Sequence, residues 1–199
     1  DWSSDVCSSD LLYQTEWVPT AVANNHLSKI ATVIGNGTSR KEFPVKLLMT
    51  HLAGRLGAKS MQTYACNAAY RDIDPTFLIA VGNDIVEEIA NSGYCDRHIV
   101  YANSDKILKY PNKFYLIPQD FISNAGSIAT YLACFDGHEK IYLLGFDNSA
   151  GELYNNNVYA GTNGYDPQWE FEIDSNKFIN NRAQLINTYS DVDFVWVTQ

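Results

Sequence analysis

The feature that most constrains the fold of this chain is a series of short apolar runs rich in β-branched and aromatic residues. Seven such runs begin at Ala31, Met61, Phe77, His98, Lys113, Lys140 and Asp193. Most of them are continuous rather than alternating, which is typical of strands that are covered on both faces. The runs therefore predict a parallel sheet.

Segments compatible with helices lie between several of these runs, at residues 42–57, 83–93 and 123–139. In the last segment, Ser123 or Asn124 suits an N-cap, and Gly137 suits a helix stop. Ile128, Leu132 and Phe135 are expected near one face of this helix. The alternation of strands and helices predicts an α/β fold, a Rossmann-like open and mostly parallel sheet with helices on both faces.

Length and charge limit the classes of function. A chain of 199 residues with 46% hydrophobic residues suits one domain, predicted here over residues 12–199. The 14 basic and 23 acidic residues give a net charge of -9, which argues against a nucleic-acid partner. No apolar run approaches the roughly 20 residues that a membrane span requires. We therefore expect a soluble, cytoplasmic domain.

The first eleven residues show neither helical nor strand periodicity. They resemble a translated sequencing-adapter read-through, so residues 1–11 are interpreted as a non-native segment and left out of the fold prediction. The four cysteines, Cys7, Cys66, Cys95 and Cys134, have no metal-ligand spacing and are expected to be reduced thiols.

Side-chain amides or a carboxylate follow five of the predicted strands. These residues are Asn36, Asn67, Asn83, Asn103 and Asp147. Ligands of open parallel sheets bind beyond the carboxyl ends of the strands, so all five side chains are expected along one ligand-binding edge. An amide offers both donors and an acceptor, which suits base edges and sugar hydroxyls. Each residue alone could equally be a turn former or a helix cap.

Two turns could hold a phosphate or a ribose. In the first, Gly35 and Gly37 are expected to allow positive φ and close backbone approach, and Thr38 and Ser39 present hydroxyls and N–H groups. In the second, Gly126 and Ser127 open the predicted helix after Asn124. The first turn has neither the full dinucleotide fingerprint nor the P-loop pattern.

Two further segments allow more than one interpretation. The polar, tyrosine-rich stretch 154–165 is either a functional loop or surface irregularity. The "DID" sequence at Asp72–Asp74 has the form of a metal-binding motif, but it precedes a strand and is better explained as a turn. No metal site is predicted.

The stretches "GNGTS", "YACNAAY", "VGND" and "NAGSIATYLACFDGHEKIYLLGFD" resemble the CMP-binding core of the bacterial sialyltransferases of glycosyltransferase family 42. They also resemble the related sialyltransferase-like proteins of phages and uncultured microbes. The resemblance covers about Ala31–Asp147. It implies a CMP or CMP-sugar ligand, a glycan acceptor, and sugar transfer with inversion, without a metal or a tightly bound cofactor.

The resemblance also implies roles for individual residues. Nucleotide contacts would fall on the first turn, on Asn67 and Asn83, and on the helix start, which comprises Asn124, Ala125, Gly126 and Ser127. Asp147 would be the catalytic aspartate, and Tyr154 would stabilise the departing phosphate.

The chain departs from the family pattern at three places. Ala125 replaces a hydroxyl residue, Asn148 and Ser149 replace an aromatic pair, and no histidine follows His138 to act as the general base. Two alternatives therefore stay open: a non-catalytic nucleotide- or glycan-binding module, and an enzyme similar to pterin pyrophosphokinases, which would need Mg and ATP.

Overall fold

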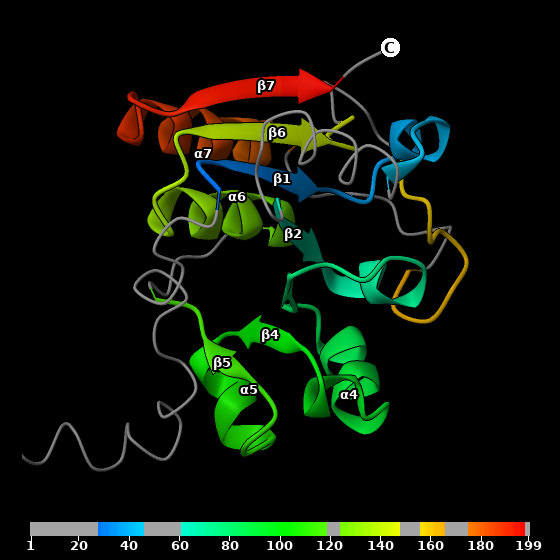
Figure 1. Ribbon diagram of the computed structural model, residues 1–199. Coiled ribbons are helices and arrows are strands. Elements are labelled where there is room, and N and C mark those ends of the chain that lie inside the picture. Colours follow the sequence, from blue (N-terminus) through cyan, green and yellow to red (C-terminus); the bar gives the residue numbers. More distant parts are fainter. Residues whose placement is uncertain (1–27, 46–60, 119–123, 148–155, 166–174, 198–199) are drawn as a thin grey trace, which may run out of the picture.

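The computed structural model describes residues 28–45, 61–118, 124–147, 156–165 and 175–197, and these residues form a seven-stranded parallel sheet (Figure 1). The strand order is β5-β4-β3-β2-β1-β6-β7. The strands are β1 (Ile30–Ile34), β2 (Gln62–Cys66), β3 (Phe77–Ile79), β4 (Ile99–Ala102), β5 (Tyr115–Leu116), β6 (Lys140–Leu144) and β7 (Asp193–Val197). All seven predicted strands and the α/β class are confirmed.

Helices cover the sheet on both faces, and this explains why most of the strand residues are apolar. Ile34, Ala65 and Leu78 pack in one core with α4 (Asn83–Asn91) and the 3-10 helix η2 (Asn67–Arg71). Val33 and Ile141 pack in a second core with α6 (Ala125–Phe135), to which Leu185 of α7 (Ser175–Thr188) and Tyr189, the residue after this helix, also contribute. Adjacent residues of a strand therefore serve opposite cores.

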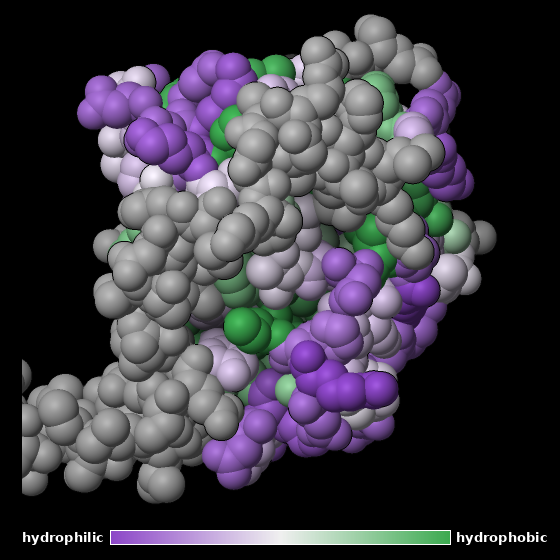
Figure 2. Space-filling model, viewed as in Figure 1, coloured by the Kyte–Doolittle hydropathy of each residue, from purple (hydrophilic) through white to green (hydrophobic). Residues whose placement is uncertain are grey.

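The remaining helices are short. They are α5 (Ser104–Lys109), η1 (Thr38–Glu42) and η3 (Tyr94–Asp96). Hydrophilic side chains gather over α4 and α5, whereas apolar side chains show in the middle of the same face (Figure 2). This is the distribution expected where the outer surface of a helix meets solvent and its inner surface meets the sheet.

The predicted helix at 123–139 is confirmed as α6. Asn124 is its N-cap and accepts a hydrogen bond from Ser127 N at 2.8 Å, and Gly137 follows the helix with φ 86°. Ile128 and Leu132 are buried, whereas Phe135, the last residue of the helix, is 44% exposed.

The chain reverses its direction across the sheet once. From β1 it steps outward through β2, β3 and β4 to β5, and then returns through α6 to β6 on the other side of β1. The reversal places a topological switch point between β1 and β6, where open α/β sheets leave a crevice for ligands. In Figure 1 the arrowheads of β1, β6 and β7 point toward the carboxyl edge of the sheet, at which this switch point lies.

Several predictions lie wholly or partly outside the described residues. Residues 1–11, Cys7, Tyr154 and most of the predicted helix at 42–57 belong to this group, and the one-domain assignment stays a prediction.

Cys66, Cys95 and Cys134 are free thiols, as expected. Among the helices of the described ranges, none has the length and apolar character of a membrane span.

Candidate functional site

The turns that follow β1 and β6 meet at the switch point. Gly35 N donates to Leu144 O at 2.7 Å, and Gly37 N donates to Gly145 O at 2.9 Å. A Cβ on Gly35 would lie 2.4 Å from Gly145 O, so the close approach of these two turns requires glycine. The expectation of positive φ at Gly35 and Gly37 is wrong, because the left-handed residue of this pair of turns is Gly145, with φ 74°.

The carboxylate of Asp147 binds the start of η1. It accepts from Ser39 N at 2.7 Å, from the Ser39 hydroxyl, and from Asn156 Nδ2 at 3.2 Å. Thr38 Oγ1 lies 3.5 Å from Asp147 Oδ2, and a Cβ on Gly37 would lie 2.5 Å from Asp147 Cγ. Thr38 and Ser39 of the first glycine turn thus converge on a carboxylate of the chain itself.

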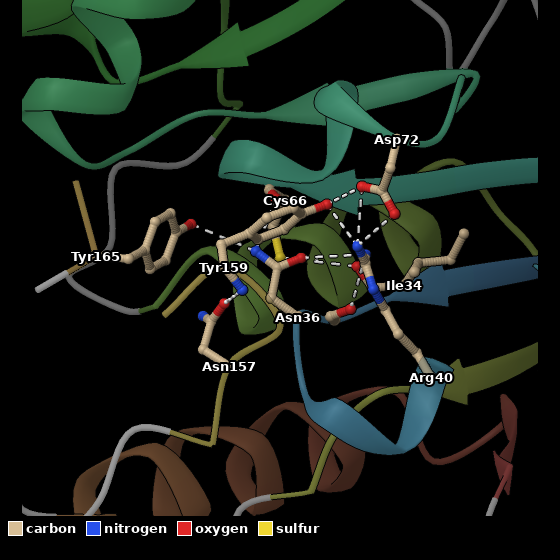
Figure 3. A network of polar contacts seen from close by, with 9 residues as sticks. Ile34, Asn36, Arg40, Cys66, Asp72, Asn157, Tyr159 and Tyr165 are labelled. Carbon is tan, nitrogen blue, oxygen red and sulfur yellow. Dashed lines mark hydrogen bonds and ion pairs between the residues drawn. The ribbon is translucent and has the colours of Figure 1, made fainter. Parts of the chain in front are cut away.

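The side chain of Asn36 connects three segments. Its Nδ2 donates to Cys66 O at 3.1 Å and to Tyr165 Oη at 3.4 Å, and its Oδ1 accepts from Arg40 Nη1 at 3.3 Å (Figure 3). Its backbone oxygen accepts from Val158 N at 2.8 Å. Asn36 therefore fastens the end of β1 to the end of β2 and to residues 156–165.

A buried cation lies beside this amide. The side chain of Arg40 is 3% exposed, and both oxygens of Asp72 lie 3.0 Å from its Nη2. The hydroxyl of Tyr159 contacts both Arg40 and Asp72, and its ring centroid lies 5.0 Å from the guanidinium carbon of Arg40. Burial raises the pKa of Tyr159 well above its ordinary value, so the hydroxyl stays protonated.

These contacts explain the "DID" sequence. Asp72 pairs with Arg40, and Asp74 Oδ1 lies 3.2 Å from Nδ1 of His98. Each carboxylate thus faces a basic side chain of the protein. Within the described ranges, no group of three histidine, cysteine or acidic side chains is arranged to hold a metal ion.

Residues 156–165, which we call the strap, cross the carboxyl ends of β1 and β2. Tyr159 and Tyr165 are buried in the core with α4. At its far end, the strap is held by Arg71 and Glu88: Arg71 Nη1 donates to Thr162 Oγ1 at 2.7 Å, and Asn163 Nδ2 donates to Glu88 Oε2 at 2.6 Å. Hydrogen bonds from Arg71 lower the pKa of Glu88 to about 2. The described part of the stretch 154–165 is therefore a packed segment rather than surface irregularity.

The other amides of the predicted edge occupy strand ends and helix starts. Asn67 has φ 50°, and its Oδ1 accepts from Val81 N at 3.0 Å, which joins the ends of β2 and β3. Asn83 is the exposed first residue of α4, and Asn103 is the N-cap residue of α5 without a side-chain capping bond. These three amides, like Asn36 and Asp147, follow strands that all run in the same direction, so the five side chains lie at the same edge of the sheet.

The first turn of α6 reaches the same edge. Ala125 and Ser127 are buried, and a Cβ on Gly126 would lie 3.1 Å from Cε1 of Phe146. Phe146 directly precedes Asp147. The positive end of the α6 dipole therefore lies against the turn that follows β6.

Two hollows open beside these segments. The first, of about 540 Å³, is lined by Thr38, Ser39, Lys41, Glu42, Leu143, Phe146, Asp147, Asn156, Trp196 and Val197. The second, of about 620 Å³, is lined by Arg40, Lys41, Phe43, Pro44, Val45, Asp72, Ile73, Val158 and Tyr159. Both volumes are in the range of small-molecule pockets.

Sequence reasoning missed four residues that shape this edge, namely Arg40, Tyr159, Tyr165 and Trp196. The two tyrosines lie in the stretch that the sequence marked as a possible functional loop. Arg40 could not be identified from the sequence, because a single arginine after a glycine turn could equally well be exposed to solvent. Trp196 looked like an ordinary strand residue in an apolar run.

Comparison with known proteins gives a structural match. No protein-family model matches the sequence, and no curated protein matches it. An α-2,3-sialyltransferase of Campylobacter jejuni in its apo form superposes with a TM-score of 0.53 at 13% identity, covering 87% of this chain and 77% of that one. The monofunctional α-2,3-sialyltransferase Cst-I of the same organism superposes with a TM-score of 0.53 at 11% identity and with the same coverage. The chain therefore has the fold of these bacterial sialyltransferases.

Proposed function

We propose that this chain is a sialyltransferase-like protein that binds a cytidine nucleotide or a CMP-sugar at the carboxyl edge of its sheet. The observation that supports this proposal most is the convergence of three segments at the switch point. The turn after β1 bonds to the turn after β6 through Gly37 and Gly145, and the first turn of α6 packs on Phe146. These are the segments in which the family resemblance locates the nucleotide contacts.

The chemistry of the edge suits such a ligand. In the proposal, the N–H groups at the start of α6 take the phosphate, since the dipole of an 11-residue helix favours an anion there. The exposed amide of Asn83 and the amide of Asn67 take polar groups of the base or the sugar without adding charge. Asn36 holds the ends of β1 and β2 together beneath the ligand.

Calorimetry with CMP tests the proposal. The wild type should bind CMP without Mg, and Asn83→Ala should bind about tenfold more weakly, which corresponds to one lost hydrogen bond. Asn103→Ala is the matched control, because Asn103 follows β4 at the same edge but lies outside the proposed contacts. Absence of CMP binding would overturn the proposal. Binding of ATP that depends on Mg, in place of CMP binding, would favour the pyrophosphokinase-like alternative.

A second candidate is a non-catalytic CMP-binding module. Sugar transfer requires a base that takes the proton of the acceptor hydroxyl while the bond between the sugar and the phosphate breaks. The carboxylate of Asp147 is engaged with Ser39 and Asn156, and the printed sequence has no histidine after His138. Incubation with CMP-sialic acid separates the candidates: released CMP indicates an enzyme, whereas binding without turnover indicates a module.

A further inference from the structure

The second hollow is separate from the proposed nucleotide contacts. Its volume is about 620 Å³, and its lining contains neither Asn67 nor Asn83 nor any residue of α6. It shares Lys41 with the first hollow, and the other lining residues of the two hollows differ. The second hollow is therefore a candidate site for a ligand of its own.

One part of its lining is a buried polar cluster. The side chain of Arg40 is 3% exposed, and its Nη2 lies 3.0 Å from both carboxylate oxygens of Asp72. The hydroxyl of Tyr159, which is also buried, contacts both side chains (Figure 3). The ion pair and these hydrogen bonds hold the three side chains in place, so this part of the hollow is formed before any ligand enters.

The rest of the lining is largely apolar. It comprises Phe43, Pro44, Val45, Ile73 and Val158. Ile73 is buried in the core with α4, and Val45 and Val158 pack against that core while they stay partly exposed. Burial of an apolar ligand surface against these side chains is favourable, because it removes apolar area from water on both partners.

The charges of the lining select the class of ligand. Arg40 and Asp72 offset each other as an ion pair, which leaves the ammonium group of Lys41. The ion pairs among the described residues do not include Lys41. In the first hollow, by contrast, Lys41 is outnumbered by the carboxylates of Glu42 and Asp147. The second hollow is thus locally positive in a chain of net charge -9, and it favours an anion.

We propose that the second hollow is a binding site for a small organic anion with an apolar body, such as an aryl or alkyl carboxylate. The anionic group binds Lys41, and the apolar body packs on Phe43, Val45 and Ile73. This site goes beyond the proposed function and does not depend on it.

Fluorescence titration with 1-anilinonaphthalene-8-sulfonate, an aromatic anion that becomes fluorescent in apolar surroundings, tests the site. The wild type should bind one equivalent. Lys41→Gln should bind at least about fivefold more weakly, since one hydrogen bond from a charged donor is lost. Phe43→Ala should weaken binding to a similar degree through lost apolar contact. The carboxylate 4-phenylbutyrate should displace the probe, and the neutral 4-phenylbutanol should displace it at least about fivefold less well.

Two variants serve as controls. Lys109→Gln removes an exposed ammonium group outside the hollow, and Trp196→Leu alters the lining of the first hollow alone. Both should bind the probe as the wild type does. Circular dichroism establishes that each variant is folded.

Several results would overturn the site: wild-type affinity in Lys41→Gln or in Phe43→Ala, loss of binding in Trp196→Leu, equal displacement by the neutral alcohol, or no binding by the wild type. Addition of CMP to the same samples separates this site from the proposed function. Saturating CMP that leaves the probe bound supports a site of its own, whereas displacement of the probe by CMP contradicts it. Probe binding without CMP binding removes the proposed function and keeps the anion site.

Discussion

At the scale of single residues, Arg40 and Asp72 form an ion pair that is buried on one side only. The Arg40 side chain is 3% exposed and that of Asp72 is 57% exposed. Removal of one partner of an ion pair is costly when the charge that stays behind is buried. Removal of Asp72 and removal of Arg40 should therefore lower the free energy of unfolding by different amounts.

We expect Asp72→Ala to lower the free energy of unfolding by about 3 kcal/mol, because it leaves the buried guanidinium without its counter-ion. Arg40→Met should cost about 1 kcal/mol, because the carboxylate left behind is solvated and the lost bonds to Gly35 O and Asn36 Oδ1 are long, at 3.4 and 3.3 Å. Urea denaturation measures both values. A larger loss in Arg40→Met would contradict this account.

A buried polar cluster lies within the second core. Tyr64, Asp136 and His138 are each less than 4% exposed, and the Tyr64 hydroxyl donates to Asp136 Oδ2. Nε2 of His138 lies 3.1 Å from Tyr64 Oη, and Nδ1 lies 2.9 Å from Ser28 O. His138 follows α6 in the sequence, and nothing in its local pattern indicates a tyrosine partner on β2.

Ser28 O only accepts, so Nδ1 of His138 is the donor in the bond between them. Burial raises the pKa of Tyr64 well above its ordinary value, which keeps its hydroxyl protonated.

Residue-level predictions were the least complete, and Asn36 shows why. The amide groups that suit a ligand also suit the backbone and side-chain groups of the neighbouring strand ends, and Asn36 bonds to Cys66, Tyr165 and Arg40. The sequence gives the chemistry of an amide. Its partners depend on segments up to 129 positions away, which no local pattern specifies.

At the scale of elements, the contact between the β1 and β6 turns is the tightest backbone approach of the candidate site. We expect Gly35→Ala to prevent stable folding or to cost several kcal/mol, since its Cβ would lie 2.4 Å from Gly145 O. Gly82→Ala is the matched control, because nothing lies within 4 Å of its Cβ and its φ is -74°. Thermal denaturation compares them, and equal melting temperatures would contradict the proposed role of Gly35.

The strap should respond to acid through Glu88. Its pKa is lowered from 4.5 to about 2, chiefly by hydrogen bonds from Arg71, so its contribution is complete above pH 4.5 and is lost as the pH falls toward 2. The difference in unfolding free energy between wild type and Glu88→Gln should therefore shrink between pH 4.5 and pH 2. Glu87→Gln is the control, because Glu87 lies 3.8 Å from Lys109 in an exposed pair. A difference that stays constant with pH would contradict this role.

Elements were predictable where burial acts on both faces of a strand. The runs at β1, β2 and β6 are apolar because helices cover them on both sides, and this pattern is visible without the structure. Helices α5 and α7 were missed for different reasons. Only six residues form α5, and the 14 residues of α7 include four asparagines, so neither gives a clear helical period.

At the scale of the whole molecule, the strand order determines where chemistry can occur. The reversal between β1 and β6 brings together turns that are more than 100 residues apart, and the sequence predicted the parallel sheet but not the position of this reversal. Strand order depends on which strands pair across the core, and apolar patterning does not encode it. The family resemblance supplied the expectation of a nucleotide at this edge, and the structure adds the second hollow, beside Arg40.

The most direct test of the central claim is hydrogen exchange of backbone amides with and without CMP. We predict slower exchange in the first turn of α6, at residues 125–127, and in the turns that follow β1 and β6. Exchange at the opposite edge, at Gln62 and Lys140, should not change. Protection confined to that opposite edge, or no protection at a CMP concentration that saturates calorimetric binding, would contradict a nucleotide site at the switch point.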